Sequence, residues 1–256
     1  MAMLDGSPGL AGSLDPVIAK LALGDDYYWA LDHLKPIIST LVGEIGARRV
    51  LEMGGGRLPL FSPAEFHAID VDYVVNDVSE RELGHLPADY SRAQFNVCNE
   101  AEVPDSLVGQ VDFVFSRMLI EHLPDTLAMY RTASKLLRPG GVGLHFHPLR
   151  YGLPFVANAL LPETVTRPIL LHFFPARADD KNPKFPAYYD HCIASRKNAA
   201  AIRETGYSEV KIVPFYDHLY FESIPIVREV DHFWNEIARA MDWSLLATYA
   251  YTLTRK

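Results

Sequence analysis

The segment VLEMGGG (residues 50–56) joins a short apolar run directly to three consecutive glycines. Its apolar residues have the pattern of a buried strand, and the glycines that follow carry no side chains. The backbone at Gly54 and Gly56 can therefore come within van der Waals distance of a ligand at the carboxyl end of a sheet. Glu52 adds a carboxylate that can hold a cationic amino group, directly or through water. The segment predicts a ligand-binding turn after the first strand.

A second carboxylate follows the next apolar run. Residues 73–75 (Tyr-Val-Val) predict the second strand, and Asp77 stands at its end. A carboxylate at this place can accept hydrogen bonds from both hydroxyls of a ribose. Asp70 and Asp72 precede the apolar run, so they are weaker candidates. Three glycines alone indicate only a tight turn, but a glycine turn combined with this acid indicates a nucleoside site.

The residues after the glycines argue against a dinucleotide. A G-x-G-x-x-G fingerprint would need glycine where this chain has Pro59. RLPLF (57–61) is also unsuited to begin a helix that holds a pyrophosphate. A nicotinamide-dependent oxidoreductase is therefore a rival with less support.

Strand and helix patterns alternate along the rest of the chain. Further strands are predicted over residues 93–97, 111–116, 142–148, 209–216 and 245–256, and helices over 25–42, 125–137, 195–206 and 226–241. This alternation predicts an α/β fold with a mostly parallel seven-stranded sheet and helices on both faces. The segments expected are a flexible N-terminal arm (1–24), a ligand-binding core (25–148), an aromatic- and proline-rich lid insertion after the fifth strand (149–195) and the completion of the core (196–256).

Four motifs together resemble the class I S-adenosylmethionine-dependent methyltransferases, which have a Rossmann-like sheet. They are VLEMGGG, NDVSE, VDFVFSRMLIEHLPD and LLRPGGVGLHFH, in the family's order over about residues 48–148. The resemblance implies S-adenosyl-L-methionine as the cofactor. The cofactor contacts that it implies are Glu52, Gly54, Gly55, Gly56, Asp77, Asn96, Val97, Ser116, Arg117 and Met118.

The resemblance also implies how these contacts divide over the cofactor. Glu52 and the glycines would lie against its methionine half, and Asp77 would hold its ribose. Asn96 would lie beside the adenine, where the family often has an aspartate instead. Glu121 and His122, after the fourth strand, match a pair that is frequent in the family but not universal.

Two histidines are the main candidates for chemistry on a methyl acceptor. Transfer from a sulfonium is an in-line displacement, and a hydroxyl acceptor benefits from a general base. His145 and His147 share one face at the carboxyl end of the fifth strand, where ligands collect in such sheets. We expect His147 to deprotonate or position the acceptor, with His145 and His122 as further catalytic candidates. The alternative is that these rings only hydrogen-bond to the inserted segment.

The same pair raises the question of a metal. Two histidines on one face with a carboxylate such as Asp190 or Glu222 could bind a divalent ion. No compact ligand motif accompanies them, so a divalent metal is possible but not indicated.

Aromatic residues next to hydrogen-bonding groups occur in FPAYYDHC (185–192) and in PFYDHLYFESIP (214–225). Such mixtures suit a hydroxylated ligand such as a sugar, whose C–H faces stack on rings. The alternative is that they pack as the core of the lid. The substrate-binding candidates are Tyr188, Tyr189, Asp190, His191, Tyr216 and Glu222.

The composition limits the classes of partner that the protein is expected to bind. The net charge of −8 and the lack of a basic run argue against nucleic acid. No run of about 18 apolar residues predicts a membrane span, and the first residues do not resemble a signal peptide. Only two cysteines are present, which is typical of a reducing compartment. We expect a cytoplasmic monomer or homodimer that binds no membrane.

These patterns favour a methyltransferase that acts on a hydroxyl of a small polar molecule, a saccharide or a specialised metabolite. N-methylation of a small amine is an alternative, because acidic residues would select a cation. A non-catalytic S-adenosylmethionine-binding module is a third possibility.

Overall fold

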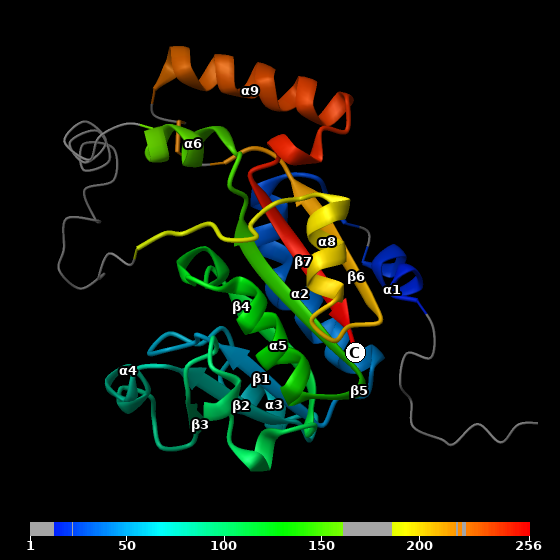
Figure 1. The fold of residues 1–256 in the computed structure, drawn as a ribbon, viewed down its shortest axis with the longest axis vertical. Coiled ribbons are helices and arrows are strands. Elements are labelled where there is room, and N and C mark those ends of the chain that lie inside the picture. Colours follow the sequence, from blue (N-terminus) through cyan, green and yellow to red (C-terminus); the bar gives the residue numbers. More distant parts are fainter. Residues whose placement is uncertain (1–12, 22, 161–185, 219, 222–223) are drawn as a thin grey trace, which may run out of the picture.

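Apolar strand segments form one central sheet in the computed structural model, which describes residues 13–21, 23–160, 186–218, 220–221 and 224–256 (Figure 1). The sheet has seven strands in the order β3-β2-β1-β4-β5-β7-β6. Its strands are β1 (Arg49–Met53), β2 (Asp72–Asp77), β3 (Ser91–Gln94), β4 (Val111–Arg117), β5 (Leu137–Pro148), β6 (Glu209–Phe215) and β7 (Tyr249–Arg255). The pairings among β1 to β5 are parallel, and β7 runs antiparallel to β5 and β6. This confirms the predicted mostly parallel α/β sheet.

Helices cover both faces of the sheet, because successive strand residues point their side chains in opposite directions. One apolar core joins α2 and α3 to residues such as Phe113 and Phe146, and the other joins α5 and α8 to residues such as Leu51 and Val114. The helices are α1 (Asp15–Lys20), α2 (Tyr27–Glu44), α3 (Pro63–His67), α4 (Glu80–Gly84), α5 (Thr126–Leu136), α6 (Leu153–Leu160), α8 (Arg196–Arg203) and α9 (Pro225–Ala240). Short 3₁₀ turns lie at η1 (Glu100–Glu102), η2 (Asp105–Leu107), η3 (Ile120–His122) and η5 (Ser244–Leu246).

Capping side chains set where the main helices begin. Asp26 accepts a hydrogen bond from Trp29 N at 2.8 Å at the start of α2, and Asp125 accepts one from Ala128 N at 2.8 Å at the start of α5. These carboxylates satisfy amide groups that have no partner inside the helix. Both helices begin within two residues of the sequence prediction.

Three expectations differ from the structure at element ends. Strand β3 covers residues 91–94 instead of 93–97, and β7 starts at Tyr249 because residues 244–246 form a 3₁₀ turn. Part of the expected arm is a helix, α1, and the preceding Leu14 is fully buried, with its amide bonded to Glu209 Oε2 at 2.7 Å. Residues 161–185 of the expected lid lie outside the described residues.

No helix in the part of the chain that the structure describes is both long enough and apolar enough to cross a membrane.

Asp112 ties the amino ends of two neighbouring strands together. It lies in β4, and one of its oxygens accepts hydrogen bonds from Arg48 N at 2.7 Å and Arg49 N at 2.8 Å. Its other oxygen accepts from the Arg138 guanidinium, and the residue is 7% exposed. This carboxylate therefore positions the start of β1, the strand that leads into the glycines.

We expect Asp112→Ala to lower the free energy of unfolding by about 2–4 kcal/mol, because it leaves two amides and an arginine without their shared acceptor. Urea denaturation followed by circular dichroism measures the change. The exposed Asp89→Ala is the matched control and should change stability by less than about 0.5 kcal/mol. Equal effects of the two substitutions would contradict this role for Asp112.

Candidate active site

The three glycines form a tight bend at the carboxyl end of β1. Gly54 and Gly56 have φ values of +70° and +51°, in the left-handed region that glycine adopts without strain. A Cβ on Gly54 would lie 2.7 Å from Leu119 Cδ1, and one on Gly55 would lie 2.7 Å from Val75 Cγ1. The bend therefore leaves no room for side chains. Gly55 N donates to Asn76 O at 2.9 Å, which holds the bend against β2.

Asp77 faces this bend. A Cβ on Gly56 would lie 3.1 Å from Asp77 Oδ2. The other oxygen, Oδ1, accepts a hydrogen bond from Ser79 N at 2.8 Å. Burial raises the pKa of the Asp77 carboxyl, and the nearby Glu82 carboxylate raises it further. The structure thus brings the glycine bend and the acid after β2 together, with one carboxylate oxygen directed at the bend.

An ion pair borders the same place. Arg57 follows the glycines and binds Glu82 of α4 through two hydrogen bonds, of 2.5 and 2.6 Å. Glu82 Cβ lies 3.8 Å from the position of a Cβ on Gly56. A charged pair therefore stands next to Asp77 on the side of α4. The sequence analysis gave neither residue a role, because only the fold brings α4 to the glycines.

Glu52 is turned into the protein. It is 2% exposed, and it accepts hydrogen bonds from the Tyr73 hydroxyl and from Leu60 N at 2.9 Å. Burial raises the pKa of its carboxyl. Direct contact with a ligand's amino group is not available in this arrangement, which corrects that part of the prediction. The carboxylate instead holds the loop that follows the glycines.

The residues expected beside the adenine make hydrogen bonds and apolar contacts with neighbouring residues of the protein. Asn96 Oδ1 accepts from Cys98 N at 2.9 Å, and Asn96 N donates to Glu102 Oε2 at 2.8 Å. Val97 is 6% exposed and belongs to an apolar core. Their contact with a nucleobase stays a prediction.

The residues that end β4 point to different places. Ser116 is buried, and its Oγ lies 2.9 Å from His145 Nδ1. Arg117 Nη2 donates to Leu58 O at 3.2 Å, so it contacts the loop after the glycines. Met118 has a φ of +52° and is 37% exposed. Of the three, Met118 is the most accessible to a ligand.

His145 and His147 share one face of β5, as expected, but that face is covered by helices. The His145 ring lies edge-on to Tyr130 of α5 with centroids 5.3 Å apart. His147 Nδ1 donates to Pro148 O at 3.0 Å, which leaves Nε2 as the acceptor of a hydrogen bond from Thr252 Oγ1 at 2.9 Å. Burial lowers the pKa of His145 to about 3 and that of His147 to about 4.

These environments do not support His147 or His145 as the general base. Both nitrogens of the His147 ring already have partners, so neither is available to accept a further proton. Burial also makes both rings weak bases, because it lowers their pKa values. A catalytic role for the pair stays a prediction that their surroundings disfavour.

Glu121 is the titratable group that sequence reasoning underused. It lies in η3, is 3% exposed, and burial raises the pKa of its carboxyl to about 8. Its Oε2 is buried and has no hydrogen-bond partner among the described residues. Its Oε1 lies 3.8 Å from Nε2 of His122, whose Nδ1 donates to Pro186 O at 2.9 Å. The available signal was a carboxylate inside an otherwise apolar segment, MLIEHLP (118–124).

The segment after the undescribed part of the expected lid binds to this loop through its backbone. Tyr188 N and Tyr189 N donate to Glu121 O at 2.7 and 3.2 Å. Asp190 Oδ2 accepts from Thr126 N at 2.9 Å, so this carboxylate serves the first turn of α5. These contacts fix the segment beside η3.

Two further substrate-binding candidates also have partners within the protein. His191 Nδ1 lies 2.6 Å from Asn198 Oδ1 of α8. The Arg239 guanidinium lies over the Tyr216 ring, 5.6 Å from its centroid, and the Tyr216 hydroxyl is buried. Glu222 lies outside the described residues. Neither His191 nor Tyr216 is brought next to Glu121 by a contact that the structure shows.

A group of rings, which we call the aromatic cluster, gathers Tyr27, Phe155, Tyr189, Tyr220 and Tyr249. The Phe155 ring centroid lies 5.5–5.8 Å from those of Tyr189, Tyr220 and Tyr249. Tyr249 pairs with Pro148, so the cluster stands at the carboxyl end of β5. The Glu121 carboxylate contributes to raising the pKa of Tyr189 and Tyr249, so it lies within electrostatic range of the cluster.

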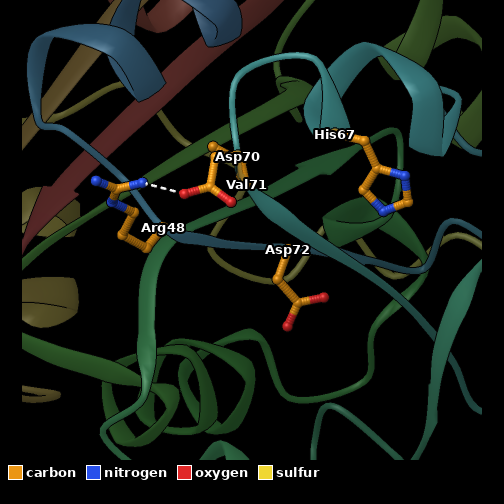
Figure 2. A pocket seen from close by; sticks show the side chains of 5 residues that line it. All are labelled: Arg48, His67, Asp70, Val71 and Asp72. Carbon is orange, nitrogen blue, oxygen red and sulfur yellow. Dashed lines mark hydrogen bonds and ion pairs between the residues drawn. The ribbon is translucent and has the colours of Figure 1, made fainter.

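Within the described ranges, no group of three or more His, Cys, Asp and Glu side chains is placed to hold a metal ion. A separate pocket is lined by Arg48, His67, Asp70, Val71 and Asp72 (Figure 2). It lies where β1 and β2 begin, at the opposite edge of the sheet from the glycine bend. Arg48 and Asp70 form an ion pair of 2.6 Å there. This pocket is not part of the candidate site.

Comparison with known proteins matches this arrangement to one family. A sequence family described as "Methyltransferase domain" matches residues 51–142. A probable S-adenosylmethionine-dependent methyltransferase of Mycolicibacterium smegmatis is 32% identical over 131 residues, which cover 50% of this chain and 48% of that protein. The ubiquinone biosynthesis O-methyltransferase of Bordetella avium is 25% identical over 173 residues, 66% of each chain. The chain thus spans about half the length of the first relative.

A solved structure agrees at the level of the fold. The methyltransferase domain of the citrinin polyketide synthase has a TM-score of 0.52 at 13% identity, covering 88% of this chain and 52% of that one. The strand order, the matched residues 51–142 and these relatives point to the same assignment. Residues 51–142 thus match a methyltransferase-domain family, and the sheet has the class I, Rossmann-like fold of S-adenosylmethionine-dependent methyltransferases.

Proposed function

We propose that the chain transfers a methyl group from S-adenosylmethionine to a hydroxyl of a small polar molecule. The observation that carries this proposal is the glycine bend facing Asp77 at the carboxyl edge of the sheet. In open α/β sheets ligands bind at this edge. The acidic net charge of −8 supports a small-molecule acceptor over nucleic acid.

The residues at the bend fit a nucleoside cofactor. A Cβ on Gly56 would lie 3.1 Å from Asp77 Oδ2, while Oδ1 is the oxygen bonded to Ser79 N. We assign Asp77 Oδ2 the role of accepting from a ribose hydroxyl. The cofactor, when bound, supplies a methyl group that is already activated on a positive sulfonium. The protein's task is then alignment, exclusion of water and removal of one proton.

We assign the proton-accepting role to Glu121 in place of His147. Glu121 Oε2 has no hydrogen-bond partner among the described residues, and a carboxyl with a pKa of about 8 is a stronger base than an ordinary one. Glu121 takes the proton when the acceptor's O–H bond breaks. The same acceptor oxygen bonds to the methyl carbon as the carbon–sulfur bond breaks, which leaves a neutral thioether. His122 stays a candidate for positioning Glu121.

The aromatic cluster supports an acceptor with a ring. Phe155, Tyr189 and Tyr249 present ring faces and edges beside the Glu121 carboxyl. Such surfaces stack on the C–H faces of a saccharide or on the ring of a specialised metabolite. The relative from Bordetella avium is named as an O-methyltransferase, which supports a hydroxyl acceptor.

N-methylation of a small amine is a second candidate. A buried carboxyl beside aromatic rings is also an arrangement that binds an ammonium group. Turnover of matched hydroxyl and amine acceptors separates the two activities. Cofactor binding without turnover of either would favour a non-catalytic module.

Asp77→Asn should weaken S-adenosylmethionine binding about 10- to 100-fold, because it replaces a charged acceptor of ribose hydroxyl hydrogen bonds with a neutral one. Isothermal titration calorimetry measures the dissociation constant. The exposed Asp89→Asn is the matched control and should bind as the wild type does. Unchanged affinity in Asp77→Asn would remove Asp77 from the site.

Glu121→Gln should lower kcat by about 10²- to 10⁴-fold while the protein still binds cofactor. With wild-type protein, kcat/KM for S-adenosylmethionine should rise as pH increases towards about 8, because this parameter reports the cofactor-free protein, in which Glu121 must lose its proton. That rise should vanish in Glu121→Gln. In His147→Gln the pH profile should keep its shape, since the ring is neutral and enclosed. A profile altered by His147→Gln but not by Glu121→Gln would restore His147 as the base.

A further inference from the structure

A buried carboxyl without a partner is unusual and calls for an explanation. Glu121 Oε2 is shielded from solvent and has no hydrogen-bond partner among the described residues. For this carboxyl the loss of hydration outweighs the hydrogen bond from the Glu121 backbone, so the neutral form is favoured. This is why the pKa of Glu121 lies near 8.

The groups that face Glu121 do not supply a fixed positive charge. His122 is its neighbour on η3, at 3.8 Å. Tyr189 and Cys192 face it from the segment bound to η3, and Tyr249 faces it from β7. Burial raises the pKa of each of these three, so they stay neutral near pH 7. Among these groups only the His122 ring can carry a positive charge, so a further cation would stabilise the Glu121 carboxylate.

The loop that carries Glu121 also borders the glycine bend. Strands β1 and β4 are neighbours with Met53 opposite Ser116, so their carboxyl ends lie side by side. Leu119, two residues before Glu121, lies 2.7 Å from where a Cβ on Gly54 would be. A ligand seated on the bend thus lies against the loop that holds the unpaired carboxyl.

We propose that Glu121 is the counter-ion of the cofactor's sulfonium: it is protonated in the empty protein and becomes a carboxylate only when S-adenosylmethionine binds. This inference rests on the proposed function. An opposite charge within about 4–6 Å lowers the pKa of a carboxyl by about 1–3, which is enough to ionise Glu121 at neutral pH. The proton passes from Glu121 to the solvent on binding. The proton acceptor is then formed only when the methyl donor is in place.

The same charge distinguishes the cofactor from its product. After transfer, the acceptor's proton is on Glu121 and the thioether is neutral, so the pair of opposite charges is gone. Glu121 therefore favours S-adenosylmethionine over S-adenosylhomocysteine. The proton that the overall reaction produces leaves the protein when the next S-adenosylmethionine binds.

The test measures protons released on binding, without turnover. S-adenosylmethionine and S-adenosylhomocysteine are titrated by calorimetry at pH 7 in two buffers of different ionisation enthalpy. A carboxyl with a pKa of about 8 is about nine-tenths protonated at this pH. For a pKa lowered by about 1–3, we expect about 0.4–0.9 proton released per S-adenosylmethionine and about none per S-adenosylhomocysteine. The affinity for S-adenosylmethionine should rise up to about tenfold from pH 6 to pH 7 and level off above about pH 8.

Three variants identify the residue that releases the proton. Release should vanish in Glu121→Gln and persist in His122→Gln and in the exposed control Glu204→Gln. Release that persists in Glu121→Gln, or equal release with the two ligands in wild-type protein, overturns the inference. The comparison of ligands in wild-type protein needs no variant to fold. If S-adenosylmethionine binds without releasing a proton, only this inference fails; if it does not bind at all, the proposed function fails as well.

Discussion

The hydrogen bond from Gly55 N to Asn76 O holds the rest of the site in place. It ties the bend after β1 to the end of β2, and it forms only because the bend has no side chains that would collide with Val75 or Leu119. With the bend in this position, Asp77 Oδ2 faces Gly56. In the residues that follow, Leu60 N donates to Glu52, which also accepts a hydrogen bond from the Tyr73 hydroxyl. One backbone contact thus sets the carboxylate and the loop on either side of the proposed nucleoside position.

Burial divides the titratable groups near the sheet edge into two kinds. It favours the neutral form of every group, so it lowers the pKa of His145 and His147 and raises that of Glu121. His147 has a hydrogen-bond partner on each ring nitrogen, whereas His145 has Ser116 beside Nδ1 and an Nε2 without a partner among the described residues. A buried carboxyl whose oxygen lacks a hydrogen-bond partner can bind a cation or a proton. The same physical factor therefore makes the histidines structural and leaves Glu121 available for chemistry.

Polar residues of the predicted acceptor site are used largely to attach one segment to another. Tyr188 and Tyr189 bind the Glu121 carbonyl through their amides, and Asp190 binds the start of α5. These bonds bring the rings of Tyr189 and Phe155 to the carboxyl edge, next to Tyr249. Backbone amides and the Asp190 carboxylate give the attachment, while the rings and Glu121 are the groups that we propose to meet the acceptor.

The local sequence pattern by itself determined the strands, the main helices, the glycine bend and the acid at the end of β2. The spacing of apolar residues and the residue types of a tight turn depend only on residues that are close in the sequence. The pattern also placed His145 and His147 on one face at the end of β5. Only the tertiary structure decided what covers that face, since α5 and α8 come from distant parts of the chain. It likewise decided that Glu52 turns inward and that Glu121 is buried without a partner. Solvent exposure and hydrogen-bond partners are properties of packed segments, so the roles of these residues could not be predicted from sequence spacing.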